Sequence, residues 1–167
     1  MGICFSDSKD SILLNLHDVD VDMFSLNGMT FNAKVVDVYD GDTCTVIFYY
    51  KDEPIKFKCR CKGYDSPEMK PPKDAKNRDD IIKNANLAKN FFINQTKNLN
   101  INIHEKYDKK ELKDILNKNT KIIKIKTYEW DKYGRLLADF YYNNVNINEL
   151  MIKEGHGYSY DGGTKMN

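Results

Sequence analysis

The sequence has little arginine, few cysteines and no long apolar run. Three of its 167 residues are arginine, whereas 23 are lysine. Apolar stretches such as residues 46–50 are far shorter than the roughly 20 residues that cross a bilayer. The four cysteines contain no CxxC pair and are too few for a dense disulfide framework. These absences exclude a membrane-spanning protein and argue against a disulfide-stabilised one, so a reducing compartment is the simpler expectation.

The net charge of +1 argues against a protein that works by coating polyanions, but the charge is unevenly distributed. Residues 1–23 contain five aspartates against Lys9 alone, which gives this leader a charge of −4 and the remainder +5. A hydrophobic content of 41% is enough for one buried core. We therefore expect an acidic leader over residues 1–30, acting as a tether without chemistry, and one domain over residues 31–167.

The first six residues fit the pattern M-G-x-x-x-[ST], which predicts myristoylation of Gly2, with Cys4 placed for palmitoylation. One myristoyl chain binds membranes only marginally, and the acidic flank offers no polybasic second signal, so Cys4 would have to supply it. We expect an intracellular protein attached peripherally to a membrane by its acyl chains. The alternative is that so short a pattern arose by chance and that the protein is cytoplasmic.

The domain begins with a run of alternating strands. Residues 31–39 and 43–50, separated by Asp40-Gly41, predict a β-hairpin. A turn at residues 52–54 leads to a third strand over 55–61, in which Cys59 and Cys61 share one face and Arg60 the other. With Cys44, these cysteines are expected to be core thiols.

Helices and two further strands complete the expected order. Apolar residues between 81 and 92 recur at spacings of four, three and four, which predicts an amphipathic helix. Asp108 and Glu111 stand in capping-box spacing for a short helix within 107–120. Residues 121–128 and 135–142 predict strands, and 148–154 a helix that ends at Gly155. The order indicates an α+β fold: a five-stranded OB-type β-barrel with two or three helices.

Three short polar segments carry the candidate chemistry. They are Asp40-Gly-Asp-Thr43, then Arg60 followed by Asp65-Ser-Pro-Glu68, and Asp131-Lys-Tyr-Gly-Arg135. Each taken singly is most simply a turn or a strand cap. The histidines His17, His104 and His156 share no ligand spacing, so a zinc site or a histidine base is not expected.

Together and in this order, the three segments resemble the motifs of the staphylococcal nuclease family. The resemblance covers about residues 33–160, and it extends to the final helix, where Asn148-Glu149 and Gly155 echo the family pattern. The resemblance implies that Asp42, Asp65 and the carbonyl of Ser66 bind Ca²⁺. It also implies that Arg60 and Arg135 grip phosphate, that Glu68 activates water, and that Tyr133 contacts substrate. Asp40 is a weaker candidate for holding metal-bound water.

Physical chemistry supports these roles independently. A phosphodiester is anionic, so hydroxide is repelled until cations neutralise the phosphate oxygens. Hard oxygen donors suit Ca²⁺ better than Zn²⁺. Guanidinium groups offer bidentate bonds that lysine cannot match, so lysine at position 60 or 135 is expected to slow the reaction with little effect on folding.

The chain also departs from the compact bacterial form. It carries a lysine-rich insertion near residues 98–119, and its loop before Asp131 is shorter. Tyr158 and Tyr160 follow the last helix but cannot be aligned securely. The lysines between 106 and 126 are partly cancelled by nearby acids, so a solvated face is favoured over a dedicated nucleic-acid patch.

We therefore expect a calcium-dependent endonuclease that cleaves DNA and RNA, leaves 3′-phosphates, and acts as a monomer. The first alternative is a non-catalytic OB-type module that binds nucleic acid or a peptide. Such domains lose the acidic and arginine residues, whereas all five positions are filled here. A membrane-tethered adaptor is a third possibility, resting on the first six residues alone.

Overall fold

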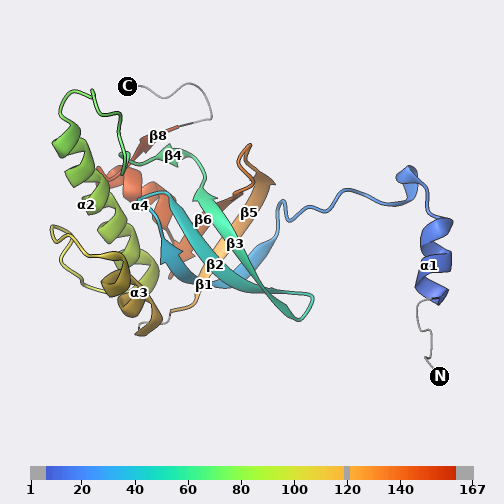
Figure 1. Cartoon of the computed structure of the whole chain (residues 1–167). Helices are drawn as coiled ribbons and strands as arrows, with labels where there is room; N and C mark the ends of the chain where they lie inside the picture. The colour runs from blue at the N-terminus through green and yellow to red at the C-terminus, as the bar shows by residue number, and fades with distance from the viewer. Residues whose placement is uncertain (1–6, 119–120, 161–167) are drawn as a thin grey trace.

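The computed structural model describes residues 7–118 and 121–160, so the acylation candidates Gly2 and Cys4 lie outside the described residues. A β-barrel forms the body of the molecule, with helices against one side and an N-terminal arm extending away from it (Figure 1). The barrel strands are β1 (Thr30–Val38), β2 (Thr43–Tyr50), β3 (Glu53–Cys61), β5 (Ile123–Trp130) and β6 (Leu136–Tyr142).

The five strands close on themselves. Antiparallel pairing gives the order β3-β2-β1-β5-β6, and β6 then pairs in parallel with the end of β3, where Arg60 stands opposite Leu137. Short strands complete the pairing: β7 (Val145–Asn146) against β6, and β4 (Tyr64–Asp65) against β8 (Tyr158–Ser159). The expected α+β fold with a five-stranded OB-type barrel is confirmed.

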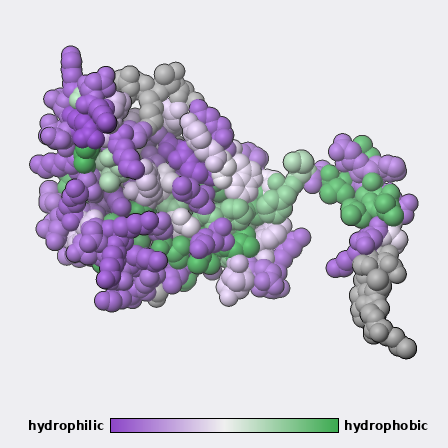
Figure 2. Space-filling model, in the orientation of Figure 1, coloured by the Kyte–Doolittle hydropathy of each residue, from purple (hydrophilic) through white to green (hydrophobic). Residues whose placement is uncertain are grey.

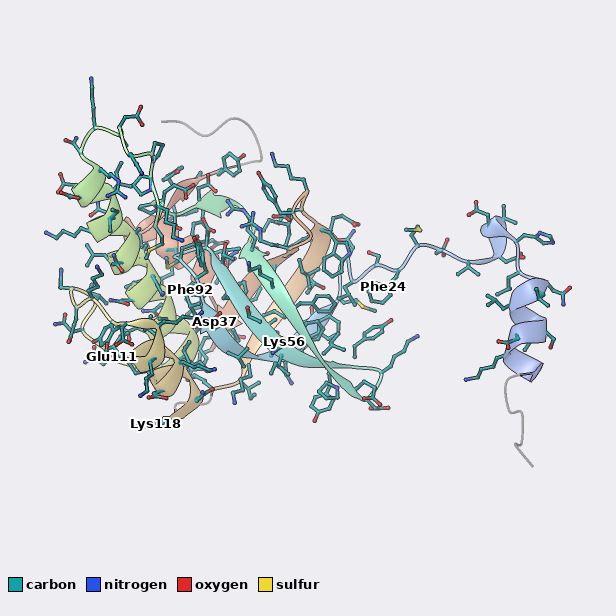
Figure 3. The ribbon with its side chains drawn as sticks, in the orientation of Figure 1. Phe24, Asp37, Lys56, Phe92, Glu111 and Lys118 are labelled. Carbon is teal, nitrogen blue, oxygen red and sulfur yellow. The ribbon has the colours of Figure 1, made fainter. Side chains whose placement is uncertain are left out.

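Alternation of side chains explains the barrel wall. In β2, Cys44, Val46 and Phe48 point inward and are buried, while the intervening residues are more exposed. Cys59 and Cys61 are also buried in the core, as their spacing predicts. The inward-facing residues of all five strands form one apolar cluster, which α2 covers through residues such as Phe92 (Figure 3).

The hairpin turns differ in detail from the sequence expectation. The β2–β3 turn lies at Lys51-Asp52, one position earlier than predicted, because both residues adopt the positive φ that a two-residue hairpin needs. Asn143-Asn144 make a second turn of this kind, which joins β6 to β7. The sequence analysis had not identified that turn.

Residues 7–118 and 121–160 contain four α-helices: α1 (Asp7–Leu14) on the arm, and α2 (Arg78–Lys97), α3 (Lys109–Lys118) and α4 (Ile147–Lys153) beside the barrel. The predicted capping box of α3 is present, with Asp108 and Glu111 each accepting a hydrogen bond from the other's backbone N–H at 2.8 Å. Leu112 and Leu116 bury one face of α3, and the side chains on its other faces are exposed.

The insertion is an ordered part of the domain. Asn90 of α2 donates to the carbonyls of Ile103 and Glu105, and Asn94 both donates to and accepts from Ile101. These amide side chains satisfy backbone groups of a segment that has no strand partner.

The N-terminal arm, expected from the sequence to be a tether, contains the helix α1 and a 3₁₀ turn at Asp18–Asp20. Phe24 touches the barrel through an edge contact with Tyr50 at a centroid distance of 5.7 Å. An apolar band runs from the barrel onto the arm, whereas hydrophilic side chains cover the helical side (Figure 2). Among the described residues, no helix has the length and apolar content to cross a membrane. The domain boundary after residue 30 stays a prediction.

Candidate active site

Three segments that are distant in sequence meet at one end of the barrel. The turn at residues 40–42 joins β1 to β2, the end of β3 leads into β4, and residues 131–135 join β5 to β6. Sheet register fixes their proximity, because Thr43 stands opposite Arg60 on β3, and β3 in turn pairs with the start of β6. The arrangement brings the three sequence motifs together.

Arg60 is the centre of the cluster. Its Nη1 donates to Asp42 Oδ1 at 2.7 Å, and its Nη2 donates to Asp65 Oδ1 and to the carbonyl of Tyr64. The Arg60 side chain is 13% exposed, and those of Asp42 and Asp65 are 6% and 0% exposed. One guanidinium therefore bridges two buried carboxylates and offsets one of their two negative charges.

The second oxygen of Asp42 is held by the segment that follows β4. Asp42 Oδ2 accepts from the backbone N–H of Ser66 at 2.8 Å and from its hydroxyl at 3.2 Å. Both oxygens of Asp42 are thus hydrogen-bonded, which fixes the orientation of the carboxylate. Asp42, Asp65 and Ser66, the predicted metal ligands, lie together.

Arg135 joins the same network through Thr43. The Thr43 hydroxyl donates to Asp42 Oδ1 at 2.9 Å and accepts from Arg135 Nη1 at 3.2 Å. Arg135 Nε also donates to Asp131 Oδ2 at 2.6 Å. Thr43 belongs to a recognised motif, but no sequence pattern indicates that it joins Arg135 to Asp42 and, through Asp42, to Arg60.

Asp131 organises the loop that carries Arg135. Its Oδ1 accepts from the backbone N–H groups of Tyr133 and Arg135, each at 2.9 Å. Burial opposes ionisation, but these hydrogen bonds and the nearby guanidinium outweigh it and lower the pKa of Asp131. The carboxylate is therefore ionised at neutral pH, and its hydrogen bonds to Tyr133 and Arg135 fix the conformation of the loop.

Tight packing fixes the β1–β2 turn. The buried hydroxyl of Tyr64 donates to the carbonyl of Gly41 at 2.6 Å. A Cβ at Gly41 would lie 2.8 Å from the Cβ atoms of both Ala88 and Ser66, which leaves no room for a side chain. Glycine at position 41 thus lets the turn lie against α2 beside Asp42. Sequence reasoning missed Tyr64 because a lone tyrosine after a strand carries no distinctive signal.

Three tyrosines surround the arginines. The ring of Tyr133, 73% exposed, lies 5.4 Å from the Arg135 guanidinium, and the ring of Tyr160 lies 6.0 Å from that of Arg60. Pairing of β4 with β8 sets Tyr158 opposite Asp65, so the tail after α4 borders the site. Planar rings beside the phosphate-binding candidates can stack on nucleobases.

Glu68 is placed differently from the other candidates. It is exposed in the segment after β4, two residues beyond the Ser66 that bonds to Asp42. This location leaves it open to water and substrate, while its chemical role stays a prediction.

The electrostatics of the site favour a hard cation. Burial, and then repulsion from Asp42, raises the pKa of Asp40 to about 6, so negative charge is concentrated in the turn. Asp42, Asp65 and the backbone carbonyl of Ser66 are hard oxygen donors, which fit Ca²⁺. No group of three or more His, Cys, Asp or Glu side chains arranged for a metal occurs in residues 7–118 and 121–160, so water or substrate would complete the coordination of any such ion.

The buried cysteines are not suited to metal binding. Burial raises the pKa of Cys59 to about 12 and raises the pKa of Cys44 and Cys61 as well, so the thiols stay protonated at neutral pH. Because a thiol must lose its proton to bind a metal, the three cysteines act as small apolar core residues.

The barrel, with an acidic pair and two arginines at one end, defines a nuclease-like OB-type domain. Residues 58–165 match the model of the family described as staphylococcal nuclease homologue, and this span is more than half of the 167-residue chain. The chain belongs to this family. Asp42 and its turn precede the matched span, so their assignment to the site depends on the geometry above.

Two curated rice proteins (Oryza sativa subsp. japonica) are similar to this chain. They are named probable staphylococcal-like nucleases CAN3 and CAN2, and each is 26% identical over 105 residues. The similarity covers 63% of this chain but 19% and 20% of those proteins. The aligned part therefore spans about a fifth of the length of the curated relatives.

Proposed function

We propose that this protein is a calcium-dependent endonuclease that hydrolyses phosphodiester bonds of DNA and RNA and leaves 3′-phosphates. The observation that carries the proposal is the single hydrogen-bonded network linking Asp42, Asp65, Arg60 and Arg135. Two of the chain's three arginines converge there. Membership of the staphylococcal nuclease homologue family, and relatives named as nucleases, support a nuclease activity.

Arg60 and Arg135 supply the charge that a phosphodiester requires. Negative charge grows on the phosphate oxygens as water attacks phosphorus, and preorganised guanidinium donors stabilise that charge in a site shielded from solvent. Thr43 ties Arg135 to Asp42, which sets the spacing between the two arginines through the protein's own hydrogen bonds. Tyr133 lies beside Arg135 and positions the adjacent nucleotide.

Asp42, Asp65 and the Ser66 carbonyl would hold Ca²⁺, which when bound supplies positive charge next to the phosphate. Glu68 accepts the proton of the attacking water. The new P–O bond forms as the bond from phosphorus to the 5′-oxygen breaks, so the phosphate remains on the 3′-oxygen. The departing 5′-oxygen takes a proton from solvent and leaves as a hydroxyl, while the exposed Glu68 returns its proton to solvent, so the step consumes one water.

Arg60 has two alternative sets of partners in this scheme. Without substrate it forms ion pairs with Asp42 and Asp65. Once a cation binds these two carboxylates, the guanidinium is available to the phosphate, so calcium and nucleic acid bind cooperatively.

The alternative is a non-catalytic OB-type module that binds nucleic acid or a peptide. The observation that favours it is that carboxylates engage both arginines, Arg60 through two ion pairs and Arg135 through one. If these pairs never open, the site is a structural brace and the protein binds ligands without cleaving them.

Cleavage assays distinguish the two proposals. Purified protein is incubated with plasmid, single-stranded DNA and RNA in Ca²⁺, in Mg²⁺ or in chelator. We expect cleavage in Ca²⁺, little in Mg²⁺ and none in chelator, because Mg²⁺ demands shorter and more regular coordination. Lysine at position 60 or 135 should lower the rate by on the order of 10²-fold or more. Arg78→Lys, the same change at the arginine outside the network, is the matched control and should cleave at the parent rate.

Binding without cleavage in every ion would establish the non-catalytic alternative. Equal rates in Ca²⁺ and chelator would instead refute the assigned cation site while leaving a nuclease.

We also propose that the protein is intracellular, monomeric and attached to a membrane by acyl groups on Gly2 and Cys4. The support is the pattern M-G-x-x-x-S with a neighbouring cysteine, and membrane attachment needs both chains because one binds only marginally.

A further inference from the structure

A groove lies at the end of the barrel away from the catalytic network. It has a volume of about 510 Å³ and is formed by the start of β1, the start of β5 and the turn from β6 to β7. Its polar lining residues are Thr30, Asn32, Lys124, Lys126, Tyr141, Tyr142, Asn143 and Asn144. Ile122 and Ile123 complete the lining, which therefore combines cations, amides, phenol rings and two apolar side chains and contains no carboxylate.

The lysines of β5 belong to this groove and are separate from those of α3. Strand alternation directs Lys124 and Lys126 outward between buried neighbours, and both are exposed. Lys124 stands opposite Asn32 on one side and Tyr141 on the other. The sequence pattern had merged these lysines with the solvated helix, whereas the fold places them along a concave surface.

Aromatic rings accompany the cations along the outer face of β5. Lys62 Nζ lies 3.9 Å from the centroid of Tyr128, and Lys126 Nζ lies 5.6 Å from it. At the groove itself, Lys121 Nζ lies 3.1 Å from the centroid of Tyr142. Alternating ammonium groups and rings suit a strand of phosphates and bases.

Two acidic residues of β5 and β6 lie near these lysines and offset part of their charge. Asp139 stands opposite Lys126, and its carboxylate accepts from the hydroxyls of Tyr128 at 2.6 Å and Tyr141 at 3.4 Å. It therefore orients the two rings. Glu129 lies further along β5, at the irregularity in register after Thr127.

The lysines and rings along β5 lead towards the catalytic arginines. Lys124 precedes Asp131 by seven residues, which at about 3.3 Å per residue places the groove on the order of 20 Å from the active site. Beyond Tyr128 the chain continues to Tyr133 and Arg135, whose ring and guanidinium are in contact. A single strand must therefore be several nucleotides long to reach both places.

We propose that the groove is an accessory binding site for the sugar-phosphate backbone of a single nucleic-acid strand, whose cleaved segment occupies the active site. The inference rests on the proposed function for the identity of the ligand. It assigns the groove a role in holding long substrates, because a ligand of one or two nucleotides cannot reach both places. An anionic lipid surface is disfavoured because the lysines and amides line a hollow that a flat headgroup layer cannot enter.

The test compares two charge-matched double variants of the full-length protein. K124Q/K126Q removes two groove charges, and K109Q/K113Q removes two exposed charges from α3. Binding of a fluorescein-labelled 20-nucleotide single-stranded DNA is measured by anisotropy in chelator, where cleavage is suppressed. The groove variant should bind on the order of tenfold more weakly in low salt. Its slope of log affinity against log salt should fall by about 1.4, since each phosphate contact on a single strand contributes about 0.7. The α3 variant should retain both the affinity and the slope of the parent.

Two further measurements keep the proposal refutable. N32D, which places a negative charge beside Lys124 with almost no change of shape, should weaken oligonucleotide binding in the same direction. In Ca²⁺, K124Q/K126Q should raise KM for a 40-nucleotide substrate by about tenfold and leave KM for a dinucleotide substrate unchanged.

The outcomes separate this proposal from the proposed function. Equal losses of oligonucleotide affinity in the two double variants would refute the proposed binding site, since the loss would then come from the change in net charge. Loss of binding to phosphatidylserine vesicles with unchanged oligonucleotide affinity would also overturn it, in favour of a lipid site. Groove-dependent binding by a protein that cleaves nothing would uphold the groove and refute the nuclease. Cleavage by the protein, together with K124Q/K126Q binding the oligonucleotide as tightly as the parent, would uphold the nuclease and refute the groove as a binding site.

Discussion

Arg60→Met is expected to destabilise the protein in chelator and to strengthen its response to calcium. The parent side chain forms two ion pairs, with Asp42 and Asp65, and is only 13% exposed. Methionine keeps the apolar stem but leaves both buried carboxylates without this guanidinium. Removing one partner of a buried pair costs about 3–5 kcal/mol, and we take the lower end, about 3 kcal/mol, because Arg60 retains some exposure. For a chain of this length, that corresponds to a loss of roughly 6–12 °C in Tm.

Calcium should reverse most of this loss. In the parent, the cation competes with Arg60 for the two carboxylates, so part of its binding energy is spent on breaking ion pairs. In the variant no such competition exists, and a ligand at 100 times its Kd stabilises by about 2.7 kcal/mol. Arg60→Met should therefore show a larger calcium-induced rise in Tm than the parent, while losing cleavage activity.

Thermal unfolding followed by circular dichroism, with and without CaCl₂, tests both statements. Arg78→Met is the control, because it removes an arginine outside the network and should leave the calcium response unchanged. A variant that melts with the parent in chelator would show that the ion pairs contribute nothing to stability. A smaller calcium response than the parent's would show that Arg60 supports the cation instead of competing with it.

Two further expectations rest on the structure and one on the N-terminal sequence pattern. Gly41→Ala should lower stability by about 1–3 kcal/mol and abolish cleavage, because the new methyl would meet Ala88 and Ser66 at 2.8 Å; a variant with parental Tm and rate would show that the turn is free to move. The free energy of unfolding should fall as pH rises above about 9, since the buried thiols keep their protons when folded and lose them when unfolded. Cys59→Ala should reduce that slope by about 1.4 kcal/mol per pH unit up to its pKa of about 12, measured by urea titration from pH 8 to 11; an unchanged slope would contradict burial of this thiol. Gly2→Ala should release the protein from membranes in a eukaryotic cell without altering cleavage by purified protein, and equal solubility of parent and variant would show that the N-terminal pattern is coincidental.

The regular strands were predictable because a barrel wall imposes a period of two. Val46 and Phe48 alternate with more exposed neighbours, and this pattern is visible without tertiary information. The two-residue strands β4 and β8 were not predictable, since Asp65 and Tyr158 pair only after the chain has folded around α4. No local propensity specifies so short a ladder.

The candidate site was predictable only as far as its motifs extend. Asp42, Arg60 and Asp65 were recognisable by type and spacing, and the structure brings them together. Thr43 and Tyr64 act through hydrogen bonds to partners that register and packing select. Such partners depend on distances across the barrel, which residue order does not encode directly.

Parallel pairing of the end of β3 with the start of β6 has a consequence for the order in which the protein becomes functional. The pairing joins residues 59–61 to residues 136–138, so barrel closure spans most of the domain. Contacts between residues so far apart in sequence form slowly, because the loop entropy must be overcome first. Arg60 and Arg135 meet only at this closing step. A ribosome-bound chain that has not yet exposed β6 therefore lacks one of the two arginines, and the network of Asp42, Arg60, Asp65 and Arg135 stays incomplete until β6 has emerged.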